Sequence, residues 1–377
     1  VTLGGRHGQA STNKLDADSL AAAVERAEAI AKQSPVDPEH VALPGPQDYG
    51  ARPQSYFDAT AGLDPVQVAD DVALVVEAAR AQGYRASGLF EGGARAEAIA
   101  NSHGLFGWQS STRADYSTTV HGPAGSGKAA QSQSCRSRLD VASLARTAVE
   151  NARMAQNPVA VDPGDYTVIF EPLAVRGLLG FMGWVMAARD ADEGTSVFSG
   201  RVGEAFLNPA VNMALRTDDP ELPAPRFGDA GLAVEPTTWV DAGTVKRLHH
   251  GRFWAEKQGT KPDAARLPLF IDGQDRSVDD LVAGCKRGLL VKNLWYIRFV
   301  DRKSLTLTGM TRDGVFLVED GKVTRPVKNL RWNESPITFL QNVLALSRAE
   351  RTGGWGYMKV PGVLSEAFTF TSVTDSI

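Results

Sequence analysis

The chain has 377 residues, of which 43% are hydrophobic and 22% charged, with a formal net charge of −4 at pH 7. No block of basic residues marks a nucleic-acid site, Cys135 and Cys285 are too few for a disulfide scaffold, and no apolar run approaches the ~20 residues of a membrane helix. The length is typical of about two globular domains. We therefore expect a soluble, cytoplasmic protein that binds neither nucleic acid nor membrane.

The first half of the chain alternates helical patterns with short extended segments. Helices are predicted from about Asp16 to Lys32, from an N-cap at Asp64, and over about 140–156. Between the last two, turn residues at Gly92-Gly93 and at 101–104 predict a β-meander. Residues 1–163 are therefore expected to form an N-terminal α/β domain with helices on a sheet.

The second half is predicted to consist mostly of strands. A strand over about 166–172 is followed by one apolar helix, LAVRGLLGFMGWVMAARDA, at 173–191. From Thr195 onward, hairpin turns are predicted at 241–243, Asp313-Gly314 and Asp320-Gly321 between apolar runs, and helices interrupt the strands at about 277–287 and 335–348. We predict an α+β fold in which residues 164–377 form a large, mainly antiparallel β domain.

The stretch HGPAGSGKAA, residues 121–130, is close to a phosphate-binding loop. Such a loop needs a Ser or Thr after its lysine, a buried strand before it and a helix after it. Here Ala129 follows Lys128, and the preceding residues are polar and alternating. The stretch is interpreted as a solvated loop, not as a nucleotide site.

No catalytic motif is evident from residue types alone. The neighbouring His249 and His250 would point to opposite faces of an extended backbone, so they cannot share one metal ion. Cys285 lies in a predicted helix, where packing is the more common role. No serine stands in a Gly-x-Ser-x-Gly elbow.

Three segments together resemble the TldD/TldE (PmbA) family of metallopeptidase-related proteins. They are EGTSVFSGRVGEAFLNP at 193–209, FGDAGLAVEPTTWVDAGTVKRLHHGRFWAEKQGT at 227–260, and the long sheet-forming segment at 288–336. Their order and spacing carry the likeness, which extends from about residue 13 to the C-terminus. A complete member of the family is expected to have a further segment before Val1.

The resemblance implies two kinds of subunit. A TldD-like subunit carries a His-Glu-x-x-x-His helix after a Leu-Leu pair, and a cysteine ligand near the C-terminus. After Leu178-Leu179, the corresponding positions here are Gly180, Phe181 and Val185, and GGWGYMKVPG at 353–362 has no cysteine. A zinc site needs about three protein ligands. The chain therefore resembles a TldE-like, catalytically empty subunit with no cofactor of its own, and zinc is expected only in a TldD-like partner.

In this family an unfolded peptide is held as an added strand in a channel between subunits, so that main-chain hydrogen bonds give affinity. The candidate peptide-binding residues are Ser196, Phe198, Gly200 and Gly203.

Three functions remain open at this stage. The chain is a non-catalytic subunit of a TldD/TldE-type zinc peptidase that matures or degrades peptides, a stand-alone dimeric peptide-binding protein, or a hydrolase with an unrecognised active site. The expected partner is a TldD-like subunit or a second copy of the chain. Whether the chain has enzymatic activity of its own is not decided by its residues.

Overall fold

The computed structural model describes residues 1–353 and 358–374. The chain divides into two compact units: one combines Val1–Leu43 with Gly251–Pro262, and the other combines Pro44–His250 with Asp263–Ile377. The boundary predicted between residues 163 and 164 lies inside the larger unit and stays a prediction.

The smaller unit is built on one long helix, α1 (Ala17–Gln33). The Asp16 carboxylate accepts the main-chain N–H of Ser19 at 2.9 Å, so the predicted first helix starts where its cap residue indicates. The short strands β1 (Thr2–Leu3) and β2 (Arg6–His7) form a hairpin beside it. A Cβ at Gly8 would lie 1.9 Å from the carbonyl oxygen of Ala27, so only glycine permits this close approach. The short helix α7 (Arg252–Gln258) completes this unit.

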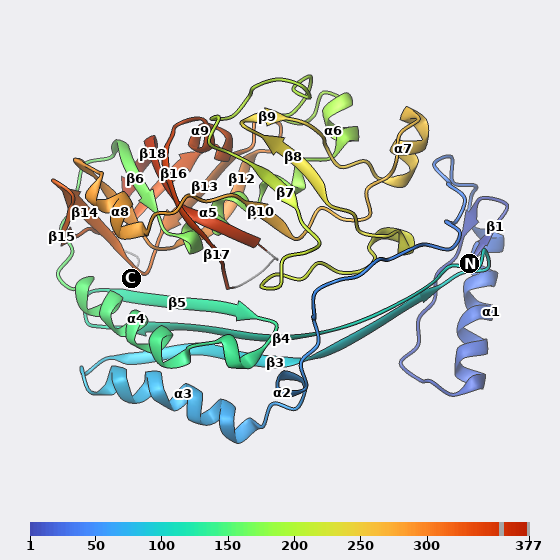
Figure 1. The fold of residues 1–377 in the computed structure, drawn as a ribbon, viewed down its shortest axis with the longest axis horizontal. Helices are drawn as coiled ribbons and strands as arrows, with labels where there is room; N and C mark the ends of the chain where they lie inside the picture. The colour runs from blue at the N-terminus through green and yellow to red at the C-terminus, as the bar shows by residue number, and fades with distance from the viewer. Residues whose placement is uncertain (354–357, 375–377) are drawn as a thin grey trace. The chain divides into compact units, whose positions relative to one another are not determined.

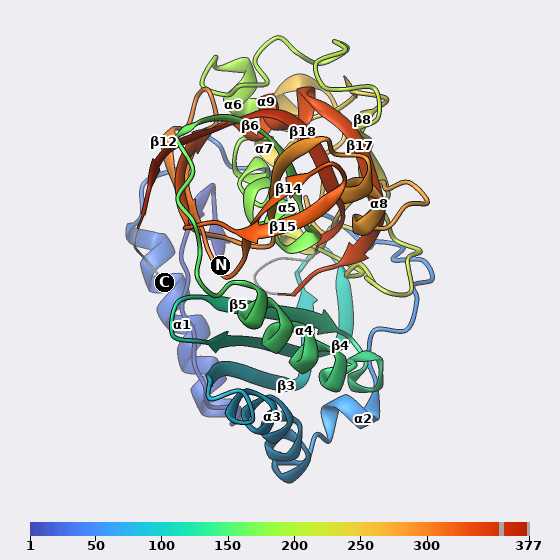
Figure 2. The ribbon, with the colours of Figure 1, turned by 90° about the vertical axis from the view of Figure 1, so that its left-hand side faces the viewer.

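Within the larger unit, the predicted meander is a three-stranded antiparallel sheet of β3 (Arg85–Ala100), β4 (Phe106–His121) and β5 (Ser126–Gln133). Helices α3 (Pro65–Arg80) and α4 (Val141–Met154) pack their alanine and valine side chains against this sheet (Figures 1 and 2). The short helix α2 (Asp58–Ala61) precedes α3. The turn predicted at Gly92-Gly93 is wrong, because both glycines lie inside β3.

Within the stretch 121–130, only residues 122–125 connect β4 to β5, and Lys128 lies within β5 and not in a solvated loop. The glycines of this stretch have a packing role. A Cβ at Gly125 would lie 2.2 Å from the carbonyl oxygen of Ala155, and one at Gly127 would lie 2.2 Å from the main-chain nitrogen of Ala152. The glycine spacing that imitates a phosphate loop is therefore explained by the close approach of the α4 backbone to β5.

The rest of the larger unit is organised by a mixed sheet, which has thirteen strands in the described residues. Its main path runs β15-β14-β11-β6-β18-β10-β7-β8-β9, with β12, β13, β16 and β17 attached beside it. The strands are β6 (Gly164–Phe170), β7 (Met213–Leu215), β8 (Thr237–Asp241), β9 (Thr244–Val245), β10 (Leu269–Ile271), β11 (Arg287–Val291), β12 (Leu294–Asp301), β13 (Thr306–Thr311), β14 (Val315–Glu319), β15 (Lys322–Pro326), β16 (Leu330–Glu334), β17 (Val343–Arg351) and β18 (Met358–Val373).

Most neighbouring strands of this sheet are antiparallel, and β10–β18 and β11–β6 are parallel pairs. Strand β18 pairs with β6, β10, β16 and β17, so it lies at the centre of the domain. Buried aromatic rings pack along it: Phe170 and Phe368 have ring centroids 4.9 Å apart. The predicted α+β class is confirmed.

Several local predictions in this half need correction. The helix expected at 335–348 is only α9 (Pro336–Gln341), and β17 begins at Val343. The helix expected at 277–287 is shorter, α8 (Val278–Ala283). Asp320-Gly321 joins the paired strands β14 and β15, as a hairpin turn does, but Asp313-Gly314 joins β13 to β14, which are not paired with each other. The sequence pattern therefore predicted the positions of α8 and α9 more accurately than their lengths.

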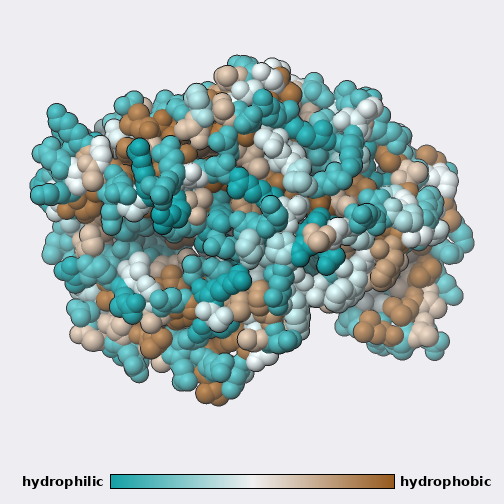
Figure 3. Space-filling model, in the orientation of Figure 1, coloured by the Kyte–Doolittle hydropathy of each residue, from teal (hydrophilic) through white to brown (hydrophobic). Residues whose placement is uncertain are grey.

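The face of the molecule drawn in Figure 3 is mostly hydrophilic, with hydrophobic residues scattered between polar ones. Among the helices of the described residues, none combines the length and the apolar character that crossing a bilayer requires.

Candidate functional site

A cavity of about 350 Å³ lies at the C-terminal end of helix α5 (Pro172–Leu179). We call it the apolar pocket. Its walls include the side chains of Trp184, Trp239 and Met358, and its ionisable lining side chains are His249 and Arg266. Trp239 is buried, whereas Trp184 is 63% exposed. The pocket is suited to an apolar side chain that reaches polar groups at one point.

Helix α5 ends earlier than the sequence suggests. The single helix predicted over 173–191 is wrong: α5 stops at Leu179, a 3₁₀ turn covers Met182–Trp184, and α6 begins only at Ala188. Glycine inside a helix costs about 1 kcal/mol relative to alanine, and the break contains Gly180 and Gly183. Both glycines line the apolar pocket, so the break in the helix opens the space that the pocket occupies.

The three positions expected to correspond to a metal motif have separate surroundings. Gly180 lines the apolar pocket. Phe181 packs edge-on against Phe299, with ring centroids 5.2 Å apart. Val185 is buried, and its carbonyl oxygen accepts the Ser196 hydroxyl at 2.6 Å. None of the three side chains has an atom that could ligate a metal ion or transfer a proton.

The donor groups around the pocket do not fit a zinc ion. His249 is the one imidazole among the described lining residues, and the neighbouring polar side chain, Arg266, is a cation. Within residues 1–353 and 358–374, no three His, Cys, Asp or Glu side chains are grouped so that they could hold a metal. A catalytic zinc site requires about three such ligands. The segment 353–362, considered for a C-terminal ligand, lies partly outside the described residues.

The two neighbouring histidines have different surroundings. The His249 main chain bonds to the chain beside it: its N–H donates to Met186 at 2.9 Å, and its carbonyl accepts the N–H of Ala188 at 2.8 Å. Burial, with a smaller effect from the Arg266 cation, lowers the pKa of His249 to about 4. His250 instead has its Nδ1 2.8 Å from the carbonyl oxygen of Leu248. At neutral pH the pocket therefore contains an uncharged imidazole, which can donate one hydrogen bond and accept another.

The segment proposed as a peptide-binding edge is not a strand. Residues 196–203 form successive turns, with positive φ at Gly200 (+72°) and Gly203 (+87°). Ser196 and Phe198 are buried, and the Ser196 hydroxyl accepts the main-chain N–H of Phe198 at 3.2 Å. The argument from strand addition does not apply to turns, so peptide binding at these four residues stays a prediction without that physical basis.

Cys285 packs in an apolar cluster with Leu281, Leu290 and Phe316. Burial raises the pKa of its thiol, so the reactive thiolate is disfavoured. This agrees with the packing role expected from the sequence.

A second cavity, of about 430 Å³, has a different character. Four arginines line it, Arg52, Arg95, Arg226 and Arg351, together with Glu97. We call it the arginine cleft. Sequence reasoning missed it because these arginines come from four separate segments, and no local motif marks any of them. The cleft and the apolar pocket share one lining residue, Leu267.

Two models of known families match the chain. The PmbA/TldA metallopeptidase C-terminal domain matches residues 163–372, and the PmbA/TldA metallopeptidase central domain matches residues 62–156. The chain belongs to the PmbA/TldA metallopeptidase family. This confirms the resemblance to TldD/TldE proteins inferred from the sequence.

A curated relative of this PmbA/TldA chain is a metalloprotease of Archaeoglobus fulgidus, 24% identical over 207 residues. That match covers 50% of this chain and 46% of the relative, so it spans less than half of the relative's length.

Solved structures share the PmbA/TldA fold over nearly the whole chain. TldE from Thermococcus kodakarensis has a TM-score of 0.87 at 20% identity, covering 98% of this chain and 88% of that one. A putative modulator of DNA gyrase from Bacteroides thetaiotaomicron has a TM-score of 0.85 at 22% identity, with coverages of 98% and 86%. A putative modulator of a DNA gyrase from Thermotoga maritima has a TM-score of 0.83 at 17% identity, with coverages of 97% and 87%. At these identities the likeness establishes the fold.

Proposed function

We propose that this chain is the non-catalytic, TldE/PmbA-like subunit of a TldD/TldE-type zinc metallopeptidase that processes or degrades unfolded peptides. The observation that carries the proposal is the donor-poor apolar pocket at the end of α5. Gly180 lines that pocket where the family resemblance places the first metal ligand, and Phe181 and Val185 pack against apolar neighbours or lie buried. The zinc and its chemistry are assigned to a TldD-like partner, and the cytoplasm is the compartment we propose for both.

In this proposal the chain contributes shape and binding surface to the complex. The break after α5 replaces a chelating helix by an apolar cavity with one neutral imidazole, which can hold a peptide side chain but cannot activate water through a metal. A subunit of this kind raises cleavage by holding substrate near the partner's metal, because positioning supplies a large part of a catalytic effect.

The test is cleavage of an unfolded peptide by three samples: this chain alone, a TldD-like protein from the same genome alone, and their mixture. We expect full activity only in the mixture, and a stable complex burying more than ~2,000 Å², the range of obligate interfaces. Equal cleavage by this chain alone would reveal an unrecognised active site. A stable homodimer that binds peptide and ignores the TldD-like protein would favour the stand-alone binding function.

A matched pair of substitutions separates chemistry from packing. In the mixture, Phe181→Leu keeps an apolar side chain beside Phe299, and Phe181→Glu introduces the carboxylate of the lost motif. An unpaired carboxylate on a packed segment costs stability, so folding of both variants is checked by unfolding in urea. Where both fold, both should support the same cleavage rate, since the reacting groups belong to the partner.

A further inference from the structure

The arginine cleft carries a concentration of positive charge that its own walls do not balance. Its described lining residues include four arginines and one carboxylate, Glu97, so their net charge is four minus one, or +3. The whole chain has a formal net charge of −4, so this local excess is opposite in sign to the rest of the molecule. A cavity whose walls carry one sign of charge raises the local concentration of ligands of the other sign.

The single carboxylate is already engaged. Glu97 pairs with the guanidinium of Arg95, and its second oxygen accepts the side-chain amide of Gln109 at 3.0 Å. The negative charge of Glu97 therefore offsets mainly the positive charge of Arg95. The charge inside the cleft therefore depends above all on the surroundings of Arg52 and Arg226.

Arg52 and Arg226 are held by main-chain carbonyl groups. Arg52 donates to the carbonyl oxygen of Val234 at 2.5 Å, and Arg226 to that of Gly50 at 3.3 Å. Among the described residues, neither arginine lies within 4.0 Å of a carboxylate oxygen. Carbonyl groups orient a guanidinium without neutralising it. Burial, and then repulsion by Arg226, lower the pKa of Arg52, and its Nε is buried without a hydrogen-bond partner.

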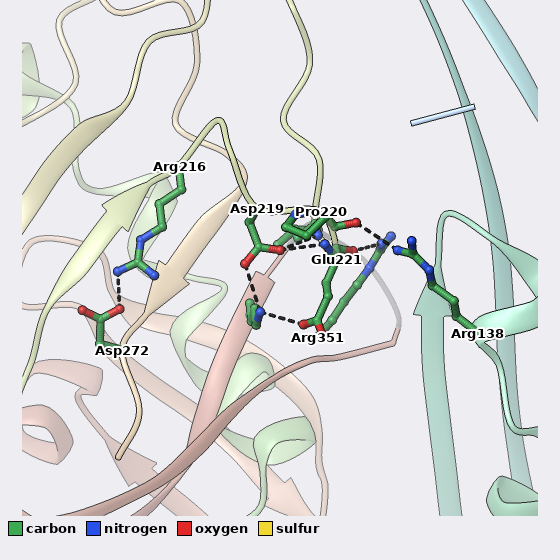
Figure 4. A network of polar contacts seen from close by, with 9 residues as sticks. Arg138, Arg216, Asp219, Pro220, Glu221, Asp272 and Arg351 are labelled. Carbon is green, nitrogen blue, oxygen red and sulfur yellow. Dashed lines mark hydrogen bonds and ion pairs between the residues drawn. The ribbon is translucent and has the colours of Figure 1, made fainter. Parts of the chain in front are cut away.

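Arg351 approaches the cleft from the end of β17 and is 7% exposed. Its Nη1 donates to the Ser134 hydroxyl at 3.2 Å and to the carbonyl oxygen of Glu221. Figure 4 shows Arg351 next to the loop that carries Asp219 and Glu221. That loop is itself held by Lys359, which pairs with Asp219 at 2.9 Å and with Glu221 at 2.6 Å. The guanidinium is thus fixed by a network before any ligand arrives, which lowers the entropic cost of binding.

We propose that the arginine cleft binds carboxylate groups of an acidic peptide segment. A planar guanidinium matches a carboxylate through two parallel hydrogen bonds. The remaining walls suit a peptide, because Ser110 and Ser111 contribute polar groups to the lining and Pro225 and Pro268 contribute apolar ones. The positive charge rests on the arginines alone, whereas the choice of a peptide as the carrier rests on the proposed function.

A nucleic acid fits these walls less well. Single strands bind through aromatic platforms on which bases stack. Phe227 is the one aromatic ring among the described lining residues; it is 8% exposed and packs against Tyr49, with centroids 5.7 Å apart. That ring is not available for stacking.

The test is calorimetric binding to the isolated chain, without any partner protein. The probes are a short unstructured peptide rich in Asp and Glu, the same peptide with Asn and Gln in their place, and inorganic phosphate. The variants are Arg226→Gln, Arg52→Gln and a matched control, Arg80→Gln, which removes the same charge from the exposed end of α3 outside the cleft. Arg226 is exposed, so its replacement is compatible with folding.

We expect the acidic peptide to bind at least tenfold more tightly than its amide counterpart, and more weakly as salt is added. Arg226→Gln should weaken it about tenfold, the typical effect of losing one charged hydrogen bond, and Arg80→Gln less than twofold. Equal affinity for the two peptides, or an effect of Arg226→Gln no larger than that of Arg80→Gln, would overturn the proposal. Phosphate binding of equal strength and equal dependence on Arg226 would assign the cleft to small anions instead.

The two proposals can fail separately, and the experiments distinguish the two failures. If the mixture with a TldD-like protein shows no gain in cleavage, yet the isolated chain still discriminates acidic from amide peptides through Arg226, the cleft is a peptide site of a protein with another role.

Discussion

His249 is the residue whose protonation most directly changes the apolar pocket. Burial and the Arg266 cation lower its pKa to about 4, well below the value of about 6.5 for a free imidazole. The unfolded chain therefore binds a proton near pH 6.5 that the folded chain accepts only near pH 4. Stability from this residue is fully present above about pH 6.5 and is lost as the pH falls toward 4.

This difference can be measured. Between pH 7 and pH 4, protonation of His249 in the unfolded state should lower the free energy of unfolding by up to about 3 kcal/mol. His249→Gln, which cannot take up a proton, should lack that part of the slope. The measurement is urea unfolding at several pH values for both proteins, because their difference cancels the carboxylates that titrate in the same range. Parallel curves would show that His249 is protonated normally in the folded state.

Zinc content tests the same pocket in another way. Gly180, Phe181 and Val185 provide no ligands, and His249 lies beside a cation. The chain purified alone and dialysed against a weak chelator should therefore contain well under one equivalent of zinc by elemental analysis. One tightly bound zinc per chain would contradict the proposed division of roles between subunits, and His249→Gln would then show whether the imidazole is a ligand.

What the sequence can predict at this scale depends on whether the signal is local. The three empty positions are recognisable because they follow Leu178-Leu179 in one short segment. The arginine cleft is not, because Arg52 and Arg351 are almost three hundred positions apart and meet only through tertiary packing. The Gly180 break was missed for a related reason. Apolar periodicity continues through 173–191, while the glycines within it end the helix.

At the scale of elements, the contact between α4 and β5 depends on glycine. Gly127→Ala would place a Cβ 2.2 Å from the main-chain nitrogen of Ala152. The atoms that it would meet belong to the α4 backbone, which can shift only at a cost in free energy. We expect a loss of about 3 kcal/mol in the free energy of unfolding, at the upper end for overpacked cores. Urea unfolding measures it.

Two controls define that prediction. Gly93→Ala, in β3, adds a Cβ that meets no atom within 4 Å, so it should change stability by less than about 0.5 kcal/mol. Lys128→Ala, next to Gly127, removes the side chain that a nucleotide site would require, and should have a similarly small effect. If Gly127→Ala were as mild as these, the glycines would need an explanation other than helix packing.

Helix starts were predicted more accurately than helix ends. Asp64 caps α3 by accepting the N–H of Val66 at 2.9 Å, with Pro65 in the first turn, as its sequence indicates. Such caps involve neighbouring residues, so the sequence contains the whole interaction. The end of α9 is not set by a local interaction of this kind. Residues 343–348 have an apolar pattern that also suits a helix, and pairing with β18 makes them part of β17.

At the scale of the whole molecule, the two cavities together indicate what kind of peptide the chain could present to a partner. One cavity is apolar with a neutral imidazole, the other is cationic, and Leu267 lines both. Under the proposed function, a substrate that places an apolar side chain in one and an acidic side chain in the other would be bound better than one that satisfies either alone. The peptides used to test the arginine cleft can also be used to assay the complex.

The central place of β18 also has a consequence for synthesis on the ribosome. Strand β6 pairs with β18, and Thr369 bonds to Asp165 across a separation of 204 residues. At roughly 5–20 residues per second, β6 waits on the order of 10–40 seconds for that neighbour. The strand pairs of the meander and their packing against α3 and α4 join segments that are close in sequence, so they can form during this interval. Strands that pair with β18, such as β6 and β16, keep an unpaired edge until it is made, so we expect this half of the nascent chain to be the more prone to aggregation.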